Sequence, residues 1–298
     1  ANNTSKNLRL ALYSRALLPK IRQETDIKYD CLERGILKIF RKKEDFEKAS
    51  KQAKILRDLG CDNRVLNKNE VYTLEPAYNT SPDKIVGGVF TPDDESGDAF
   101  KFTTELATYL SSAGVNFRFS EKIISLNTNG NRVVSVTTDK SILESDTVVM
   151  SMGSYSPFIL KPLDIKLPIQ PAKGYSVTVP IAGHNGAPTI SLSDEDHKVV
   201  ITRLGDRMRI AGTVEFTGYN TEMDKDRAKS ICNIAQSLFP TGGDYTRAEF
   251  WSGLRPLTPD CVPIIGSTVF TNLYLNTGHG SLGWTMCASS GKIISDII

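Results

Sequence analysis

The spacing of apolar residues along the chain predicts five helices. Near the amino terminus, Leu8, Leu12 and Ala16 recur every four residues, the spacing of an amphipathic helix. The segment 43–60 repeats this helical period and closes on Gly60, a residue typical of helix ends. The same period predicts three more helices, at 100–114, at 223–239 and from about Leu282 to the end of the chain.

Strands are predicted where apolar residues alternate with polar ones or run together. A hairpin is expected around Asn129–Gly130, because Asn-Gly is a strong turn signal between two strands. The apolar run 146–153 predicts a strand buried on both faces. The passage 75–98 is rich in Pro, Gly and Asp, which predicts loops of binding character. Further strands are expected as a pair around Gly35, at 115–120, at 272–277 and in the alternating patterns of 168–254.

The order of these elements predicts two domains woven from one chain. The segments 97–166 and 253–298 mix helices with strands, whereas 21–96 and 167–252 are mostly β. Residues 1–20 form a separate helical segment. The fold class expected is therefore mixed α/β and α+β.

Composition and charge exclude several classes of protein. The 298 residues hold 36 Lys and Arg against 34 Asp and Glu, a net charge of +2, which argues against a nucleic-acid partner. The sequence contains no run of 18 apolar residues, so no membrane span is predicted. The first residues lack the apolar stretch of a signal peptide. The five cysteines are scattered, which favours a reducing, cytoplasmic location, and the histidines lie far from other metal-ligand types, so no metal site is predicted.

A glycine loop near the end of the chain is the first candidate for a binding site. Gly278, Gly280 and Gly283 spell G-x-G-x-x-G between a predicted strand and a predicted helix. Too few residues follow for the second strand and the acidic residue, about 20 positions on, that complete a dinucleotide fingerprint. A strand–glycine–helix turn still presents free N–H groups and a positive helix end to a planar or anionic ligand. The alternative is that the glycines only close a tight strand–helix connection.

Two terminal motifs carry a family resemblance. The stretch "GLRPLTPDCVPIIG" at 253–266, together with "YLNTGHGSLGWTMCASSGK" at 274–292, resembles the carboxyl-terminal signature of the D-amino-acid oxidase superfamily of flavoenzymes. Within it, the nearest likeness is to the small subunit of the bacterial D-amino-acid dehydrogenases. Three more stretches agree with the resemblance, which runs from about Leu8 to the last residue: "TPDDESGDAFKFTTELA", "VVMSMGSYSPFIL" and "PIQPAKGYSVT".

The resemblance implies a fold and an activity. The fold is a Rossmann-like FAD-binding domain of the glutathione-reductase type, interleaved with a mostly antiparallel β substrate domain with flanking helices. The activity is FAD-dependent oxidation of a D-amino acid such as D-alanine, in which a hydride passes from Cα to flavin N5. A 2-oxo acid and ammonia result, and the electrons pass to a respiratory acceptor. A glycine or sarcosine type of amine oxidase is the alternative within the superfamily. The implied location is cytoplasmic, with a peripheral place at the inner face of the bacterial plasma membrane left open.

One departure from the family pattern shapes the expectations for this polypeptide. The family begins with a βαβ unit whose G-x-G-x-x-G grips the FAD pyrophosphate, and at least ~30 residues of such a unit are missing from this sequence. We therefore expect the FAD-binding domain formed by 97–166 and 253–298 to be incomplete, and the chain alone to be an FAD-free fragment. A non-catalytic fragment or a subunit that needs a partner chain is the alternative of another class. Self-association through the exposed half-domain is a further expectation.

The resemblance also implies site residues. Arg255, in "GLRP", would hold the substrate carboxylate in two parallel hydrogen bonds, and a tie between two loops is its alternative role. Tyr175 would lie over the substrate, or else form a cross-strand pair. The pyrimidine end of the flavin would be lined by Gly278, His279, Gly280, Ser281, Leu282 and Gly283.

Three other residues are expected at the dinucleotide half of FAD. Gly153 and Ser154 follow a predicted buried strand and would lie near this half. The backbone of Ile123 would approach the adenine, with ordinary strand core as the alternative. His279 could act as a general base, but packing of the glycine loop or one hydrogen bond to the flavin is the role we expect. Asp98 is expected to cap the helix that follows it.

Overall fold

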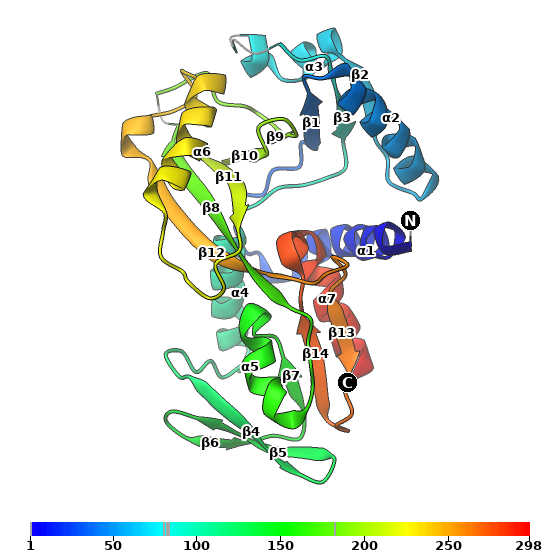
Figure 1. Ribbon diagram of the computed structural model, residues 1–298, viewed down its shortest axis with the longest axis vertical. Helices are drawn as coiled ribbons and strands as arrows, with labels where there is room; N and C mark the ends of the chain where they lie inside the picture. Colours follow the sequence, from blue (N-terminus) through cyan, green and yellow to red (C-terminus); the bar gives the residue numbers. More distant parts are fainter. Residues whose placement is uncertain (1, 80, 82–83, 182) are drawn as a thin grey trace.

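An eight-stranded sheet forms the larger part of the structure, a computed structural model that describes residues 2–79, 81, 84–181 and 183–298 (Figure 1). All neighbouring strands are antiparallel except β1 and β9, which are parallel. In spatial order the strands are β12 (Glu249–Leu257), β8 (Gln170–Pro180), β11 (Arg207–Glu215), β10 (Val199–Leu204), β9 (Ser191–Asp194), β1 (Ile36–Phe40), β3 (Gly87–Thr91) and β2 (Arg64–Asn67).

One face of this sheet is apolar and lies under α6 (Lys225–Leu238). The apolar side chains of α6 recur at three- and four-residue spacing, so they form one stripe, which packs on strand residues such as Val177 and Ile210. The opposite face of β8, β11 and β12 carries small residues, polar residues and one aromatic residue, Trp251. Burying one face leaves the other free to bind a ligand.

Two three-stranded sheets form the lower part of the molecule in Figure 1. In the first, β14 (Leu273–Thr277) lies between the antiparallel β13 (Ile264–Ser267) and the parallel β7 (Val148–Met150). The second is a meander of β4 (Ile123–Asn129), β5 (Arg132–Thr138) and β6 (Ile142–Glu144). The Asn272 side chain joins the two sheets, because it accepts from Val133 N at 2.9 Å and donates to Val133 O at 2.8 Å.

Helices complete the architecture. The long α1 (Asn2–Thr25) packs against α7 (Gly283–Ile297), so the first and the last helix of the chain are neighbours (Figure 1). The remaining α-helices are α2 (Lys43–Asp58), α3 (Lys68–Leu74), α4 (Ala99–Ser112) and α5 (Ser156–Leu160). Short 3₁₀ helices are η1 (Pro76–Asn79), η2 (Gly153–Tyr155), η3 (Lys161–Leu163), η4 (Tyr245–Arg247) and η5 (Gly280–Leu282).

The five predicted helices and the Asn129–Gly130 hairpin are confirmed. Asp98 caps α4, since its carboxylate accepts from Phe100 N and Lys101 N. The fold class is also confirmed. The division into two domains stays a proposal. Its boundary between 252 and 253 falls inside β12, which belongs to the large sheet up to Leu257.

Four predictions differ from the structure, three of them for strands and one for a loop region. Of the strand pair expected around Gly35, only the second strand forms, as β1, and the residues just before Gly35 make the single bridge Leu32–Ser96. The segment 115–120 is not a strand, since no described strand lies beside it to supply hydrogen bonds, and Phe119 is 75% exposed. The segment 75–98 is not all loop, because it contains β3.

The fourth concerns β7, which is not buried on both faces. Val149 is 39% exposed, because one edge of β7 has no neighbouring strand among the described residues. Parallel strands in complete sheets are normally covered on both faces.

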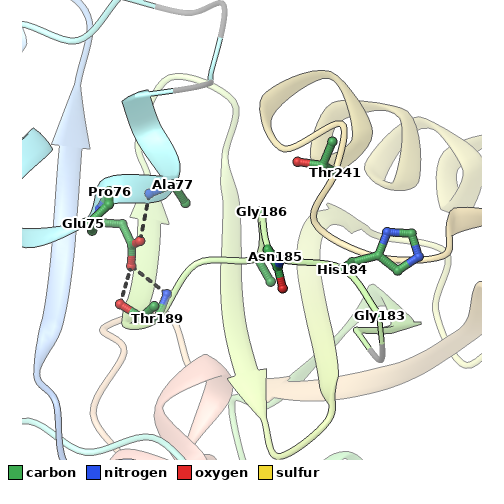
Figure 2. A pocket seen from close by; sticks show the side chains of 10 residues that line it. Glu75, Pro76, Ala77, Gly183, His184, Asn185, Gly186, Thr189 and Thr241 are labelled. Atoms are coloured by element: carbon green, nitrogen blue, oxygen red, sulfur yellow. Dashed lines mark hydrogen bonds between the residues drawn. The ribbon is translucent and has the colours of Figure 1, made fainter.

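A buried carboxylate joins the part of the large sheet around β1–β3 to the rest of that sheet. Glu75 is fully buried and accepts from Ala77 N at 3.1 Å, from Thr189 N at 2.6 Å and from Ile190 N at 3.0 Å. The Thr189 hydroxyl donates to it as well, at 3.0 Å. Figure 2 shows this carboxylate at the wall of a cavity of about 570 Å³, with its oxygens turned toward these donors. Its acceptor capacity is therefore used for structure.

Substituting this carboxylate should destabilise the fold. In Glu75→Gln, an amide nitrogen faces backbone N–H groups, so buried donors lose their acceptor, and we expect the free energy of unfolding to fall by about 2 kcal/mol or more. Urea titration of both proteins, followed by circular dichroism, measures the difference. The control is Glu24→Gln at the exposed end of α1, expected within about 0.5 kcal/mol of the parent. Equal midpoints for Glu75→Gln and Glu24→Gln would contradict the structural role of Glu75.

Candidate functional site

Arg255 lies on β12 with its guanidinium over the backbone of β8. An added Cβ at Gly174 would lie 2.6 Å from Nη1 of Arg255 and would overlap the rest of the guanidinium, so only glycine fits there. The guanidinium donates one hydrogen bond, from Nη1 to the carbonyl of Thr213 at 3.2 Å. Gly174 therefore forms the floor on which this charge rests.

No carboxylate neutralises Arg255 within the ranges that the structure describes. Its only polar contact there is the Thr213 carbonyl, and burial lowers the pKa of the guanidinium because the charge loses water. An arginine stays protonated in proteins even so. A half-buried positive charge without an acidic partner is suited to binding an anion, and its planar fork matches a carboxylate.

The carbonyl that holds Arg255 comes from an irregular point of β11. The register of β11 on β8 shifts between Gly212 and Val214, which is a β-bulge. Thr213 at this bulge has a φ of 53°, a left-handed conformation that is rare for a β-branched residue. Strained backbone of this kind tends to occur at functional sites. Here the strained residue is the one whose carbonyl contacts Arg255.

The glycine loop packs against the end of β12. Gly278 has a φ of 77° and Gly280 a φ of 56°, conformations that favour glycine. An added Cβ would lie 2.9 Å from Thr258 Cγ2 at Gly278, and 2.9 Å from Leu257 Cδ2 at Gly280. The loop therefore needs glycine for both its turns and its close packing. It leads through Ser281 and Leu282 in η5 to Gly283, the first residue of α7.

His279 lies in this loop and packs against α7. Its Nε2 lies 2.9 Å from the Ser290 hydroxyl, and burial lowers the pKa of the imidazole. The ring is therefore neutral at pH 7.

The end of β7 meets the same junction. Thr277 Oγ1, at the end of β14, donates to the carbonyl of Gly153 at 3.3 Å and lies 3.2 Å from the Ser156 hydroxyl. A Cβ at Gly153 would lie 3.7 Å from Pro256, next to Arg255. The carboxyl ends of parallel strands are where α/β folds bind their ligands. The structure thus brings Gly153 and Ser154 together with residues 278–283 and the strand of Arg255.

The residues of this junction fit a bound FAD. Ser154 Oγ and Asn276 Oδ1 are buried, and neither has a hydrogen-bond partner in the part of the chain that the structure describes. Buried polar atoms are normally satisfied, so these two are available to a ligand. The amino-terminal end of α7 adds the positive end of a helix dipole. The sequence, however, carries no glycine turn within a βαβ unit, the feature that holds a pyrophosphate.

Tyr175 and Ile123 do not lie at this junction. Because Gly174 faces Arg255, the alternation of the strand turns the next side chain, Tyr175, to the opposite face, where it is buried in the core. Its hydroxyl donates to Glu215 Oε2 at 2.5 Å. Ile123 begins β4 and packs against the core cluster that contains Leu126. Ile123 therefore lies in strand core, the alternative named for it, whereas Tyr175 packs in the apolar core on the face away from Arg255.

Four positions of this site were missed from the sequence. Thr213 carries no recognisable signal, because a bulge cannot be read from one strand alone. Gly174 and Gly253 could have been noticed, since glycine inside an alternating strand often marks a close approach. Trp251 lies on the same face as Arg255, two positions before Gly253.

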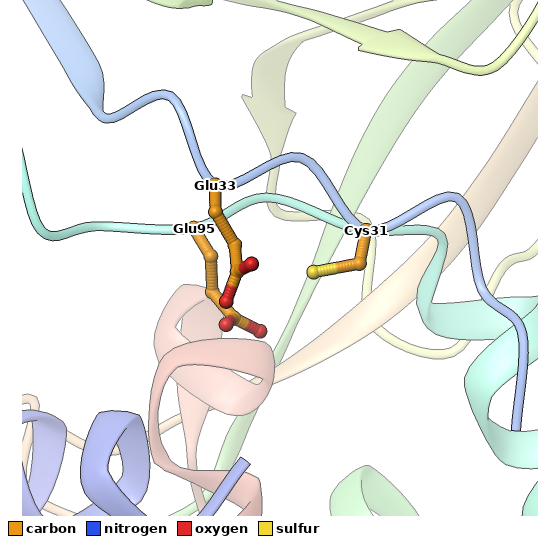
Figure 3. A group of neighbouring side chains, drawn as sticks. All are labelled: Cys31, Glu33 and Glu95. Atoms are coloured by element: carbon orange, nitrogen blue, oxygen red, sulfur yellow. The ribbon is translucent and has the colours of Figure 1, made fainter. Parts of the chain in front are cut away.

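The side chains of Cys31, Glu33 and Glu95 lie close together on two neighbouring segments of the chain (Figure 3). Their ligand atoms lie within 4.8 Å of one another, as in metal sites. Arg22, however, binds both carboxylates, with Nη1 at 2.7 Å from Glu95 Oε2 and Nη2 paired with Glu33. Burial raises the pKa of the Cys31 thiol, which keeps it protonated. We therefore interpret the group as an ion-pair network.

This network reaches the first turn of α7 through aromatic contacts. Arg22 Nη1 also donates to the Tyr29 hydroxyl at 2.6 Å. The Tyr29 ring packs edge-on against Trp284, with 5.5 Å between ring centroids. Trp284 follows Gly283 directly, so the network holds the end of the glycine loop in place.

Curated proteins are similar to this chain over nearly its whole length. A D-amino acid dehydrogenase of Paramagnetospirillum magneticum is 47% identical over 296 residues, which cover 99% of this chain and 70% of that protein. One of Allorhizobium ampelinum is 46% identical over 298 residues, 100% of this chain and 70% of that protein. No helix among the described residues has both the length and the apolar character needed to cross a bilayer.

Solved structures show the same fold. A glycine oxidase of Bacillus cereus superposes with a TM-score of 0.84 at 25% identity, over 97% of this chain and 79% of the other. An L-proline dehydrogenase of P. horikoshii superposes with a TM-score of 0.85 at 19% identity, over 98% of this chain and 78% of that protein. The sequence model of the family described as FAD dependent oxidoreductase matches residues 2–297. Because that match spans almost the whole sequence and the curated relatives agree with it, the chain belongs to the FAD-dependent oxidoreductase family.

Proposed function

We propose that the protein is a D-amino-acid dehydrogenase in which Arg255 binds the substrate carboxylate. The observation that carries the proposal is the half-buried Arg255 guanidinium, which has no acidic partner among the described residues and stands on the strand whose end packs against the glycine loop. The substrate becomes a 2-oxo acid and ammonia, and its electrons pass to a respiratory acceptor. When bound, FAD supplies the two-electron oxidation of the C–N bond.

The chain's own groups orient the substrate and hold the cofactor. Two N–H groups of Arg255 would bind the two carboxylate oxygens, which fixes the Cα of the substrate relative to the glycine loop. Backbone groups of 278–283 would contact the pyrimidine end of the flavin, where the helix end favours negative charge. We assign His279 to packing of the loop, because its Nε2 already contacts Ser290. Gly153, Ser154 and Ile123 stay predictions for the dinucleotide half.

The choice of a D-amino acid rests on the relatives. Those named D-amino acid dehydrogenase are 44–47% identical to this chain, whereas the glycine oxidase of Bacillus cereus is 25% identical. The glycine oxidase alternative is therefore less well supported. We further propose a place at the inner face of the bacterial plasma membrane, where a respiratory acceptor would be reached. We also propose self-association through the free edge of β7, because an unpaired strand edge readily pairs with another.

The visible spectrum tests whether the flavin site works. A working flavin site gives purified protein, supplied with FAD, a flavin band that bleaches anaerobically with D-alanine but not with L-alanine or glycine. Bleaching by glycine, followed by peroxide release in air, would favour the oxidase alternative. A protein that stays colourless after incubation with FAD would instead favour the fragment that needs a partner chain.

Replacing the guanidinium tests the carboxylate clamp. Arg255→Lys keeps the charge but not the planar fork, so the KM for D-alanine should rise about 100-fold, as expected for loss of charge-assisted hydrogen bonds. Initial rates with an artificial dye acceptor measure it. The matched control is Arg9→Lys, at an exposed position of α1, for which no change is expected. An unchanged KM in Arg255→Lys would contradict the clamp.

A methyl group on the floor of the site tests the position of that guanidinium. Gly174→Ala puts a Cβ where the Arg255 guanidinium lies, so the arginine must move, and we expect the KM for D-alanine to rise at least about tenfold. Steady-state rates and far-ultraviolet circular dichroism are compared with those of Gly291→Ala, where an added Cβ meets nothing within 4 Å. Gly174→Ala with the KM of the parent would show that the arginine does not need this floor.

A further inference from the structure

Trp251 exposes a large aromatic surface beside the candidate substrate site. It lies on β12 opposite Ser176 of β8, and Arg255 lies opposite Ala172, so both side chains emerge on the same face of the sheet. Trp251 is 58% exposed, although most tryptophans are largely buried. An aromatic ring left open next to an unpaired guanidinium is suited to contact with a bound ligand.

The indole is directed toward Arg255 by a second glycine. An added Cβ at Gly253 would lie 2.7 Å from Cζ2 of Trp251, so the ring lies over Gly253. Gly253 pairs directly with Gly174, over which the Arg255 guanidinium lies. Side-chain positions of directly opposed residues are about 5 Å apart. The edge of the indole and the guanidinium therefore lie above neighbouring points of one glycine floor.

Arg209 holds the other side of the indole. Its Cζ lies 5.6 Å from the centroid of the Trp251 ring, a cation–π distance, and its Nη2 donates to the Ser176 hydroxyl at 3.1 Å. Arg209 lies opposite Thr178 on β8, so it belongs to the same polar face as Trp251. Along β8, the three side chains therefore follow one another on this face in the order Arg209, Trp251 and Arg255.

We infer that Trp251 forms the wall of a subsite for the side chain of the substrate and that Arg209 is a positioning residue for it. The inference rests on the proposed function, because it takes the carboxylate to lie on Arg255. A ligand bound there through its carboxylate brings the atoms beyond the carboxylate next to the indole. A flat or extended apolar side chain gains contact with the ring, whereas a methyl group is too short. The subsite therefore favours D-amino acids with aromatic or long apolar side chains, such as D-phenylalanine and D-methionine, over D-alanine.

Binding of two simple carboxylates tests the subsite without turnover. Benzoate has a flat apolar body and acetate has only a methyl group, so they share the contact with Arg255 and differ in reach. Isothermal titration of the FAD-loaded protein should show benzoate binding weakened about tenfold in Trp251→Ala, with acetate unchanged within about twofold. Trp251→Phe keeps an aromatic wall, so its affinity for benzoate should lie between that of the parent protein and that of Trp251→Ala. If Trp251→Ala proves unfolded by circular dichroism, Trp251→Leu takes its place.

The outcomes separate this inference from the proposed function. Equal weakening of both ligands in Trp251→Ala, or weakening of neither, overturns the subsite and leaves the clamp intact. Arg255→Lys should weaken both ligands, and if it weakens neither, the clamp fails and the subsite with it. For Arg209, Arg209→Met should weaken benzoate alone and Arg209→Lys should restore it, because lysine keeps the cation over the ring. No restoration by lysine overturns the positioning role. Across these variants, the ratio of kcat/KM for D-phenylalanine to kcat/KM for D-alanine should fall as the affinity for benzoate falls.

Discussion

The pairing of β12 with β8 is the constraint on which the site depends. Nine consecutive residue pairs fix the register of these strands, and that register sets Gly253 against Gly174 and Arg255 against Ala172. A slip of one residue would turn the guanidinium into the core beside Tyr175. The same strand ends at Leu257, against which the glycine loop packs. One strand pairing thus relates the place for a carboxylate to the place for a flavin.

The two faces of β8 divide structure from chemistry. Toward α6 the strand presents Tyr175 and Val177, which belong to a continuous apolar core. Toward the site it presents glycine and Ser176, together with the partly buried Arg255 of β12. A charge held without a counter-ion contributes little to stability, and the strained Thr213 contributes less than a relaxed residue would. The apolar face compensates for both.

Features that are set by neighbouring residues in the sequence were predicted correctly. Features that depend on contacts between distant segments were not. Arg255 and the glycines at 278–283 stand in contiguous motifs, so their proximity followed from the family resemblance. The helices followed from their periods. The face on which Tyr175 lies could not be read, because the segment around it places small, polar and apolar residues on both sides of the strand. The absence of a strand at 115–120 depends on a pairing partner, which a single segment does not reveal.

The packing of α1 on α7 has a consequence for how the chain folds. Ser14 in α1 accepts a hydrogen bond from the backbone of Ala288, 274 residues away in the sequence. Helix α1 is synthesised well before α7, against which it packs. Until α7 is made, Leu18 cannot pack with Ala288 in their shared apolar cluster. Contacts of such long range slow folding and prolong the exposure of apolar surface. We therefore expect α1 to need protection by chaperones until α7 has been made.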